Sequence, residues 1–301
     1  MSAPLARTSP ALQRLRRLSR RRDARADEGV LLVDGPVLLD EALRSGLTVT
    51  AVFADEDVDP TTDVLLRARD AGIEVATVRS GDLARVLDLV TPRGVVAVVE
   101  QPAHRLADVL GESVRLRRPV VVAVELQDPG NAGTLVRVAE AAGAVGVVFT
   151  TGSVDPWNPK AVRAAAGASL RLPVVPGVSV DEVVDGLASA GVRLIATSAA
   201  GASFPEDSDL GGSFALCIGN EAHGLDQGFL DSADGLVTIP MAGAVESLNA
   251  GVAAAVVLFD AARQRRSVPG SEVVRERVGS VGHDVADVAD DDQDGAGRGG
   301  A

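Results

Sequence analysis

The sequence is poor in the residues on which several common functions depend. Its 301 residues include one cysteine, Cys217, so the chain forms no intramolecular disulfide and has no thiolate metal site. The three histidines, His104, His223 and His283, are too far apart for a ligand pattern such as H-x-x-x-H, which argues against a protein-bound zinc. We therefore expect no metal site.

Long apolar runs are absent too, and lysine is almost absent. No run of about 18 uncharged apolar residues occurs, and the arginine-rich start lacks the apolar segment of a secretory signal. We therefore expect a cytoplasmic protein that does not cross a membrane. Lys160, the sole lysine, follows Pro159 rather than glycine, so the chain has no G-x-x-x-x-G-K-[ST] loop for nucleoside triphosphates.

Charge is distributed unevenly along the chain, whose formal net charge is -13. Residues 1–25 carry eight arginines against one aspartate, whereas the last 21 residues carry six aspartates against one arginine. Because binding to phosphates requires a basic surface, we expect the N-terminal arm, residues 1–28, to contact nucleic acid. Leucines at 12, 15 and 18 predict a short amphipathic helix in this arm. We expect the acidic tail, residues 279–301, to be disordered.

Strand-like and helix-like segments alternate in two series, which predicts an α/β protein of two domains. The first series, residues 29–100, has apolar runs at 30–33, 49–54, 74–78 and 95–99, with helical segments between them. Residues 101–118 contain Pro102 and few periodic apolar positions, so we expect a linker there. The second domain would span residues 119–278.

In the second series, residues 120–125 form a nearly continuous apolar run, as expected of a strand that is covered on both faces. The turn Asp128-Pro129-Gly130 and a helix from Asn131 to Ala142 follow it, and a strand over 145–150 comes next. The turn does not match the G-x-G-x-x-G of nicotinamide and flavin enzymes, and no acidic residue closes that next strand. We therefore expect a different ligand.

Further loops follow predicted strands at 194–197, 214–218 and 236–239. We expect a long helix from Glu246 to about Arg266, with Ser247 and Asn249 at its start. Open α/β sheets bind ligands at the carboxyl ends of their strands, so these loops predict one site. Arg137, in an otherwise apolar helix face, is costly unless it serves a ligand or an ion pair with Glu125 or Glu140.

Three of these segments carry a resemblance to a known family. They read N-x-G-x-x-x-R from Asn131 to Arg137, I-G-N-E-x-x-G-L from Ile218 to Leu225, and I-P-M-x-G-x-x-E-S-L-N from Ile239 to Asn249. Together they resemble the SpoU family of the SPOUT superfamily, RNA ribose 2′-O-methyltransferases that use S-adenosylmethionine. Residues 158–169 also match the family's N-P-K-x-x-R pattern, and the first series is similar to its L30e-like substrate-binding domain.

The resemblance implies an L30e-like domain followed by a SPOUT domain whose C-terminal segment forms a trefoil knot, in a homodimer that uses the helix from Glu246 as an interface. It implies catalytic roles for Arg137, Asn131, Glu221, Ser247 and Asn249. It implies cofactor contacts by Thr197, Gly219, Asn220, Ile239, Pro240, Met241 and Leu248. We expect RNA contacts by Lys160, Arg163, Arg14, Arg17 and Arg21; Trp157 and Phe204 are candidates for stacking on bases.

We therefore expect an enzyme that methylates ribose 2′-hydroxyls of 23S ribosomal RNA. Two alternatives stay open: a transfer RNA 2′-O-methyltransferase, and a non-catalytic protein of this fold that binds RNA or assists ribosome assembly. For the family, the arginine has been proposed as a general base. A guanidinium is a poor base near neutral pH, so we expect Arg137 to hold a phosphate and stabilise developing negative charge instead.

Overall fold

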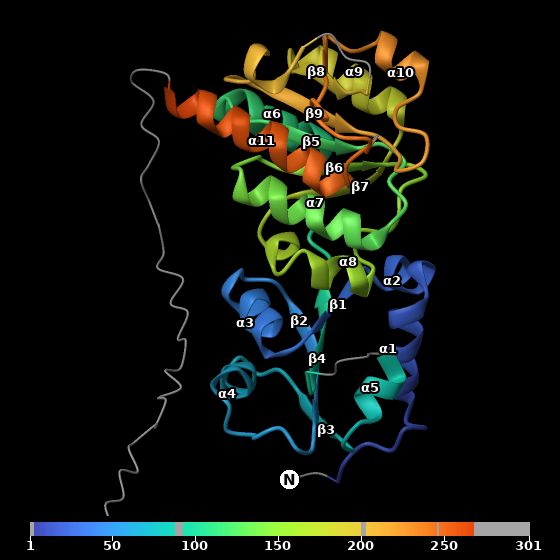
Figure 1. Cartoon of the computed structure of the whole chain (residues 1–301). Coiled ribbons are helices and arrows are strands. Elements are labelled where there is room, and N and C mark those ends of the chain that lie inside the picture. Colours follow the sequence, from blue (N-terminus) through green and yellow to red (C-terminus); the bar gives the residue numbers. More distant parts are fainter. Residues whose placement is uncertain (1–2, 88–92, 200–202, 246, 268–301) are drawn as a thin grey trace, which may run out of the picture.

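The computed structural model describes residues 3–87, 93–199, 203–245 and 247–267, and it contains a four-stranded and a six-stranded sheet. Figure 1 shows the smaller sheet and its helices in the lower half of the molecule and the larger sheet in the upper half. The strand order is β1-β4-β2-β3 in the first sheet and β10-β8-β9-β5-β6-β7 in the second. The predicted α/β class is confirmed.

The first sheet is mixed. Strand β4 (Val95–Glu100) runs antiparallel to both β1 (Val30–Asp34) and β2 (Val49–Asp55), whereas β2 is parallel to β3 (Val75–Val78). Alternate residues of β1 and β4 are buried in two different clusters, one with helices α3 and α4 and the other with α1 and α5. The helices of this unit are α1 (Pro10–Arg20), α2 (Arg22–Glu28), α3 (Pro36–Arg44), α4 (Asp63–Asp70) and α5 (Asp82–Leu87).

The N-terminal segment, which we expected to be an arginine-rich arm that contacts nucleic acid, packs against the first sheet. Leu12, Leu15 and Leu18 of α1 are almost completely buried and pack against the first sheet, as the spacing of these leucines predicts for an amphipathic helix. Helix α2 continues directly into β1. Residues 10–28 are therefore a packed part of the first unit.

The expected linker, residues 101–118, also contains regular structure. Its residues 106–116 form helix α6 (Leu106–Leu116), and Val109 and Leu110 are buried in the core of the second sheet. Charged residues between these apolar positions lower the overall hydropathy of the segment, which is why it resembles a linker in sequence. Helix α6 belongs by its packing to the second unit.

All strand pairs of the second sheet are parallel. In β5, Val121 and Ala123 face one layer of helices while Val120 and Val122 face the other, so the continuous apolar run is covered on both faces as predicted. Helices α7, α8 and α11 lie on the first face and α6, α9 and α10 on the second. The elements after α6 are β5 (Val120–Ala123), α7 (Pro129–Ala141), β6 (Val147–Thr150), α8 (Pro159–Ala164), β7 (Val174–Val178), α9 (Val180–Ala190), β8 (Arg193–Thr197), β9 (Phe214–Ile218), α10 (Gln227–Asp231), β10 (Gly235–Val237) and α11 (Ala250–Ser267).

The last strand and helix are shorter than predicted. Strand β10 ends at Val237 rather than at 239, and helix α11 begins at Ala250. Glu246, where we expected the helix to begin, lies outside the described residues. The Asn249 side chain accepts hydrogen bonds from the first N–H groups of α11, which fixes the start of the helix. The acidic tail also lies outside the described residues, and the trefoil knot stays a prediction.

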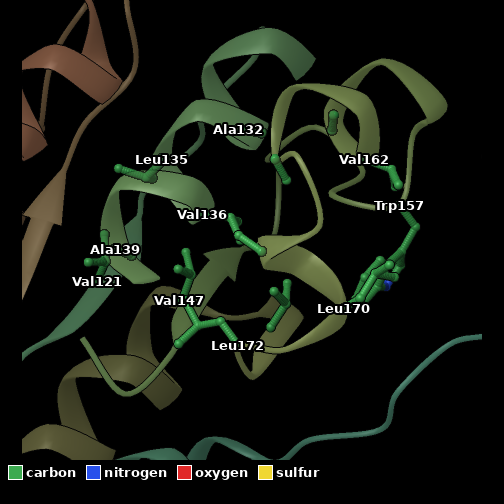
Figure 2. Packing of buried hydrophobic residues seen from close by; sticks show 14 of the residues in the cluster. Val121, Ala132, Leu135, Val136, Ala139, Val147, Trp157, Val162, Leu170 and Leu172 are labelled. Carbon is green, nitrogen blue, oxygen red and sulfur yellow. The ribbon is translucent and has the colours of Figure 1, made fainter. Parts of the chain in front are cut away.

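The two units are joined by a buried ion pair and by apolar packing. Arg25 of α2 donates from Nε to the Asp155 carboxylate at 3.0 Å, and both residues are buried. Trp157, a candidate for base stacking, is only 3% exposed and packs beside Val162 and Leu170 in the core that Figure 2 shows. Trp157 therefore cannot stack on RNA without leaving the core.

Removing the Asp155 carboxylate should strongly destabilise the protein, because the charge of Arg25 would stay buried with only backbone carbonyl partners. We expect Asp155→Ala to lower the free energy of unfolding by about 3–5 kcal/mol in urea denaturation. The control is Asp108→Ala, since the pair between Arg105 and Asp108 lies on the surface and should contribute little. Equal stabilities for both variants would contradict a stabilising role for the Arg25–Asp155 pair.

Candidate active site

The carboxyl ends of the parallel strands bring the predicted loops together. Strand β9 lies between β5 and β8, and β8 pairs with β10. In this register Ala123 is opposite Ile218 and Thr197 is opposite Val237, so the segments that follow all four strands leave the same edge of the sheet. The edge is the place where open α/β sheets bind ligands.

The loop after β9 is a tight turn that needs glycine. A Cβ atom on Gly219 would lie 2.4 Å from the carbonyl carbon of Gly224, which is impossible without moving the backbone. Asn220 and Gly224 exchange two backbone hydrogen bonds of 3.1 and 2.9 Å, and Gly224 has a left-handed φ of 68°. The Asn220 side chain also donates to the carbonyl oxygen of Glu125 at 2.9 Å, which links this loop to the loop after β5.

Glu221 holds the loop after β5 through three hydrogen bonds. Its carboxylate accepts from the backbone N–H groups of Gln127 and Asp128, both at 3.0 Å, and from the Asn131 side chain at 2.9 Å. Burial raises the pKa of Glu221, but these donors outweigh it, and the pKa lies below its ordinary value. The carboxylate is therefore ionised at neutral pH and acts as an anchor between two loops.

Asn131 connects this anchor to helix α11. Its amide oxygen accepts a hydrogen bond from the Asn249 side chain, whose own oxygen caps α11 through the N–H groups of Gly251 at 2.9 Å and Val252 at 3.3 Å. Gly251 packs closely on α7, because a Cβ there would lie 2.6 Å from the Thr134 Cγ2 atom. The structure thus brings together three of the five predicted catalytic residues: Glu221, Asn131 and Asn249.

Arg137 and Ser247, the other two predicted catalytic residues, are exposed. Within the described part of the chain, neither the Arg137 side chain nor the Ser247 hydroxyl has a hydrogen-bonding partner, and Arg137 forms no ion pair. Glu140, a carboxylate that we considered for Arg137, pairs instead with Arg171, whose Nη2 lies 2.8 Å from a Glu140 oxygen. The guanidinium of Arg137 is therefore available to a ligand.

The predicted cofactor residues lie on the β10 side of the same edge. The Thr197 hydroxyl donates to the Cys217 carbonyl oxygen at 3.0 Å, where β8 and β9 end. Ile239, Pro240, Met241 and Leu248 belong to the segment between β10 and α11, and Met241 and Leu248 are each 37% exposed. Exposed apolar side chains beside the carboxyl ends of the strands suit a flat apolar ring that also forms hydrogen bonds with the backbone, such as adenine.

An apolar surface covers the outer side of α11. Val252, Val256 and Phe259, spaced by four and three residues on one helical face, are 47%, 41% and 49% exposed. A hollow of about 540 Å³ lies between this face and the segment after β10, with Ile239 and Pro240 in its lining. Three exposed apolar side chains thus share one face of α11.

The five predicted RNA-binding residues all form ion pairs within the protein. Lys160 lies beside the active-site loop, with its Nζ 3.0 Å from an Asp128 carboxylate oxygen. This contact and the N–H group of Asn131, which Asp128 caps, hold the pKa of Asp128 below its ordinary value. The remaining pairs are Arg163 with Asp34 at 3.9 Å, Arg14 with Glu28 at 2.7 Å, Arg17 with Glu28, and Arg21 with Asp23.

Sequence reasoning missed the part that Asp128 and Gln127 play in the site. Asp128 caps α7 with a 2.9 Å hydrogen bond from the Asn131 N–H group, and Gln127 presents a backbone N–H to Glu221. The signal was present, because an aspartate before Pro-Gly-Asn is a typical N-cap. A backbone donor such as the N–H group of Gln127 cannot be recognised from the sequence, because every residue except proline has one.

The described residues contain neither a candidate metal site nor a candidate membrane span. They contain no group of three or more His, Cys, Asp or Glu side chains placed to hold a metal ion. Among their helices, none combines the length and the apolar character that crossing a bilayer requires.

Comparison with known proteins identifies this arrangement. Residues 118–259 match the model of the SpoU rRNA Methylase family, and residues 9–97 match the MRM3-like substrate binding domain. The chain is 36% identical over 265 residues to an uncharacterised tRNA/rRNA methyltransferase of Mycobacterium tuberculosis, which covers 85% of this chain and 81% of the relative. The chain therefore belongs to the SpoU family of RNA methyltransferases.

Two other proteins are similar over most of their length. One is the 23S rRNA (guanosine(2553)-2′-O)-methyltransferase RlmP of Bacillus subtilis, 31% identical over 78% of this chain and 89% of the relative. The other is the SpoU methyltransferase AviRb from Streptomyces viridochromogenes, whose crystal structure matches with a TM-score of 0.77 and 31% identity over 86% of this chain and 98% of that one. AviRb has also been solved in complex with the cofactor AdoMet.

The Glu221 anchor should make the stability of the protein depend on pH. Because the folded-state pKa of Glu221 is depressed, its contribution is present above the unfolded pKa, about 4.3, and is lost as the pH falls through the folded value. We expect Glu221→Gln to lower the melting temperature at pH 7, and we expect its difference from the unchanged protein to shrink as the pH falls below about 4.3.

Glu74→Gln is the matched control, because the exposed Glu74 side chain accepts no hydrogen bond in the portion of the chain that the structure describes. Its melting temperature should follow that of the unchanged protein at every pH. A pH-independent difference for Glu221→Gln would show that the charge of Glu221 is not what holds the loops.

Proposed function

We propose that the protein is an S-adenosylmethionine-dependent RNA methyltransferase that modifies a ribose 2′-hydroxyl of 23S ribosomal RNA. The observation that carries the proposal is the chain of hydrogen bonds from Glu221 through Asn131 to Asn249, with the unpaired Arg137 on the same helix as Asn131. The match to RlmP supports ribosomal RNA and the 2′-oxygen. The AdoMet complex of AviRb supports the cofactor.

The residues present suit S-adenosylmethionine. Gly219 permits the tight turn at the end of β9, because a side chain there would meet the backbone of Gly224 and Leu225. Met241 and Leu248 offer apolar surface for adenine, and Ile239 and Pro240 lie in the same segment. We assign cofactor contacts to these residues together with Thr197 and Asn220. When bound, the cofactor supplies a methyl group that is already a strong electrophile.

The protein's task is therefore to orient the ribose and to help its proton leave. We assign Asn131, Asn249 and Ser247 to the pocket around the ribose, with Glu221 keeping Asn131 in place through its hydrogen bond. Arg137 would bind a phosphate of the target and stabilise the negative charge that develops on the 2′-oxygen. A permanently charged guanidinium serves this role better than it serves as a base.

Substrate RNA would reach the site from the first unit, residues 29–100 in our division, which corresponds to the matched substrate binding domain. Lys160 lies next to the active-site loop, and its pair with Asp128 is exposed, so RNA phosphates can replace this partner at small cost. We assign it a contact close to the target nucleotide. Arg14, Arg17, Arg21 and Arg163 would contribute only where their ion pairs open.

We also propose that two chains associate through the outer face of α11. This face is apolar and exposed, and it adjoins the segment that carries the cofactor residues. A second copy of the same face would cover Val256 and Phe259 and would complete the site from the other protomer. We also propose that the C-terminal segment of the SPOUT domain forms a trefoil knot, as the resemblance to the family implies.

Loss of the Arg137 guanidinium should remove methyl transfer and spare cofactor binding. We expect Arg137→Ala to lower the transfer of labelled methyl groups to ribosomal RNA at least about 100-fold, because electrostatic stabilisation of the reacting oxygen is lost. Binding of S-adenosylmethionine, measured by calorimetry, should change little. Arg115→Ala is the control, since Arg115 is exposed and paired with Glu112 on α6. Full activity of Arg137→Ala would refute the role assigned to Arg137.

A charge on the outer face of α11 should separate the dimer. We expect Phe259→Asp to sediment as a monomer in analytical ultracentrifugation where the unchanged protein sediments as a dimer, because burying an unpaired carboxylate in an apolar interface is costly. Leu66→Asp, on the exposed side of α4, is the control and should leave the mass unchanged. A monomeric unchanged protein would contradict the proposal.

A further inference from the structure

Three arginines lie near the end of α11, at the edge of the second sheet opposite the candidate active site, and one of them, Arg266, also lines the hollow beside the outer face of α11. Arg118 directly precedes β5, and Arg265 and Arg266 lie in the last turn of α11. Arg265 donates from Nη2 to the carbonyl oxygen of Ala142 at 2.8 Å, which ties the end of α11 to the turn before β6. The N–H group of Val145, after that turn, donates to the carbonyl oxygen of Pro119, the residue next to Arg118, at 2.9 Å.

One of the hydrogen-bond donors of Arg265 has no acceptor among the described residues. Its Nη1 atom is buried and has no hydrogen-bonding partner among the described residues. A buried donor on a charged group is costly unless something accepts from it. Burial lowers the pKa of Arg265, and the like charges of Arg118 and Arg266 lower it further. The protein has therefore placed three positive charges together, one of them partly buried.

Three arginines in nearby elements pair with carboxylates, whereas Arg117, like Arg118, has no ion pair in the part of the chain that the structure describes. Arg115 pairs with Glu112, Arg193 with Asp209, and Arg263 with Asp260. Within the described portion of the chain, Arg118, Arg265 and Arg266 have no such carboxylate partner. This contrast is informative in a chain with a net charge of -13, because acidic side chains are abundant and could have been used. The group of three lacks an anion.

We propose that Arg118, Arg265 and Arg266 form a phosphate-binding site, and that its ligand is a backbone phosphate of the RNA substrate. A phosphodiester offers two acceptor oxygens, which suit the forked N–H groups of arginine. The phosphate part of the inference is independent of the enzyme's activity, whereas its assignment to RNA rests on the proposed function. The site would bind the RNA far from the reacting ribose, so it would contribute affinity and orientation without reading sequence.

The first test measures RNA binding at several salt concentrations. Full-length protein is titrated with 23S ribosomal RNA, and the unchanged chain is compared with Arg118→Gln/Arg266→Gln and with Arg265→Gln. We expect each variant to bind about 10-fold more weakly, as for lost hydrogen bonds to charged groups, and the slope of log K against log [KCl] to fall by about 1. The double variant alters only exposed side chains, so it tests the site even if Arg265→Gln fails to fold.

Arg115→Gln is the control, matched in charge to Arg265→Gln, because it removes one positive charge from the same region but takes it from an existing ion pair. Its affinity should stay within about twofold of the unchanged protein. Equal affinity and equal salt dependence for the double variant and the unchanged chain would overturn the inference.

A second test uses inorganic phosphate and does not depend on RNA. Phosphate should raise the melting temperature of the unchanged protein and of Arg115→Gln by more than that of the double variant, because only the first two keep the site. The same shift for all three would overturn the site. If removing residues 279–301 abolishes the difference between the variants in RNA binding, the acidic tail rather than RNA occupies the arginines, and the assignment to RNA fails.

Methyl transfer separates this inference from the proposed function. At saturating RNA, Arg118→Gln alone should transfer methyl groups as fast as the unchanged protein, because Arg118 precedes β5 on the edge opposite the reacting groups. Arg266 lines the hollow beside the cofactor segment and the proposed dimer face, so the double variant is not used in this comparison. If the unchanged protein transfers methyl groups but the double variant binds RNA equally well, only the site fails. If no RNA accepts a methyl group, the proposed function fails, and the phosphate measurement still decides whether the site exists.

Discussion

The carboxylate of Glu221 is the constraint on which the candidate active site depends. It lies in a loop that only glycine at 219 permits, and it accepts three hydrogen bonds from the loop after β5 and the start of α7. Asn131 in turn accepts a hydrogen bond from the side chain of Asn249, which also fixes the start of α11. One ionised group thus sets the relative position of segments about 90 and 120 residues apart in the chain. A site held in this way is preorganised before any ligand arrives.

The same helix that carries Asn131 and Arg137 is also connected to the first unit. Arg171 lies 2.8 Å from a Glu41 oxygen of α3 and pairs with Glu140 near the end of α7. Together with the buried pair of Arg25 and Asp155, this bridge fixes the first sheet relative to α7. RNA held by the first unit would therefore meet the reacting groups in a defined orientation. Positioning of this kind supplies a large part of the catalysis of a bimolecular reaction.

Local sequence predicted the parts of the structure that depend on local chemistry. The strand at 214–218 was predicted with its observed bounds because an apolar run ends at Gly219, and the three motif loops do lie at one edge of the sheet. What the sequence could not reveal depends on distant partners. The carboxylates that neutralise Arg14 and Arg163, and the cores that bury α1 and α6, come from other parts of the chain. An exposed guanidinium and a paired one look identical in sequence.

The central claim is that the enzyme methylates the 2′-oxygen of a ribose, and the chemical position of the transferred methyl group tests it most directly. Ribosomal RNA from a strain that lacks this gene would be incubated with the protein and labelled S-adenosylmethionine, then hydrolysed in alkali. A 2′-O-methyl group blocks cleavage at its nucleotide, so the account predicts label in alkali-stable dinucleotides. Label in mononucleotides would mean that a base is the acceptor, and that result would contradict the account.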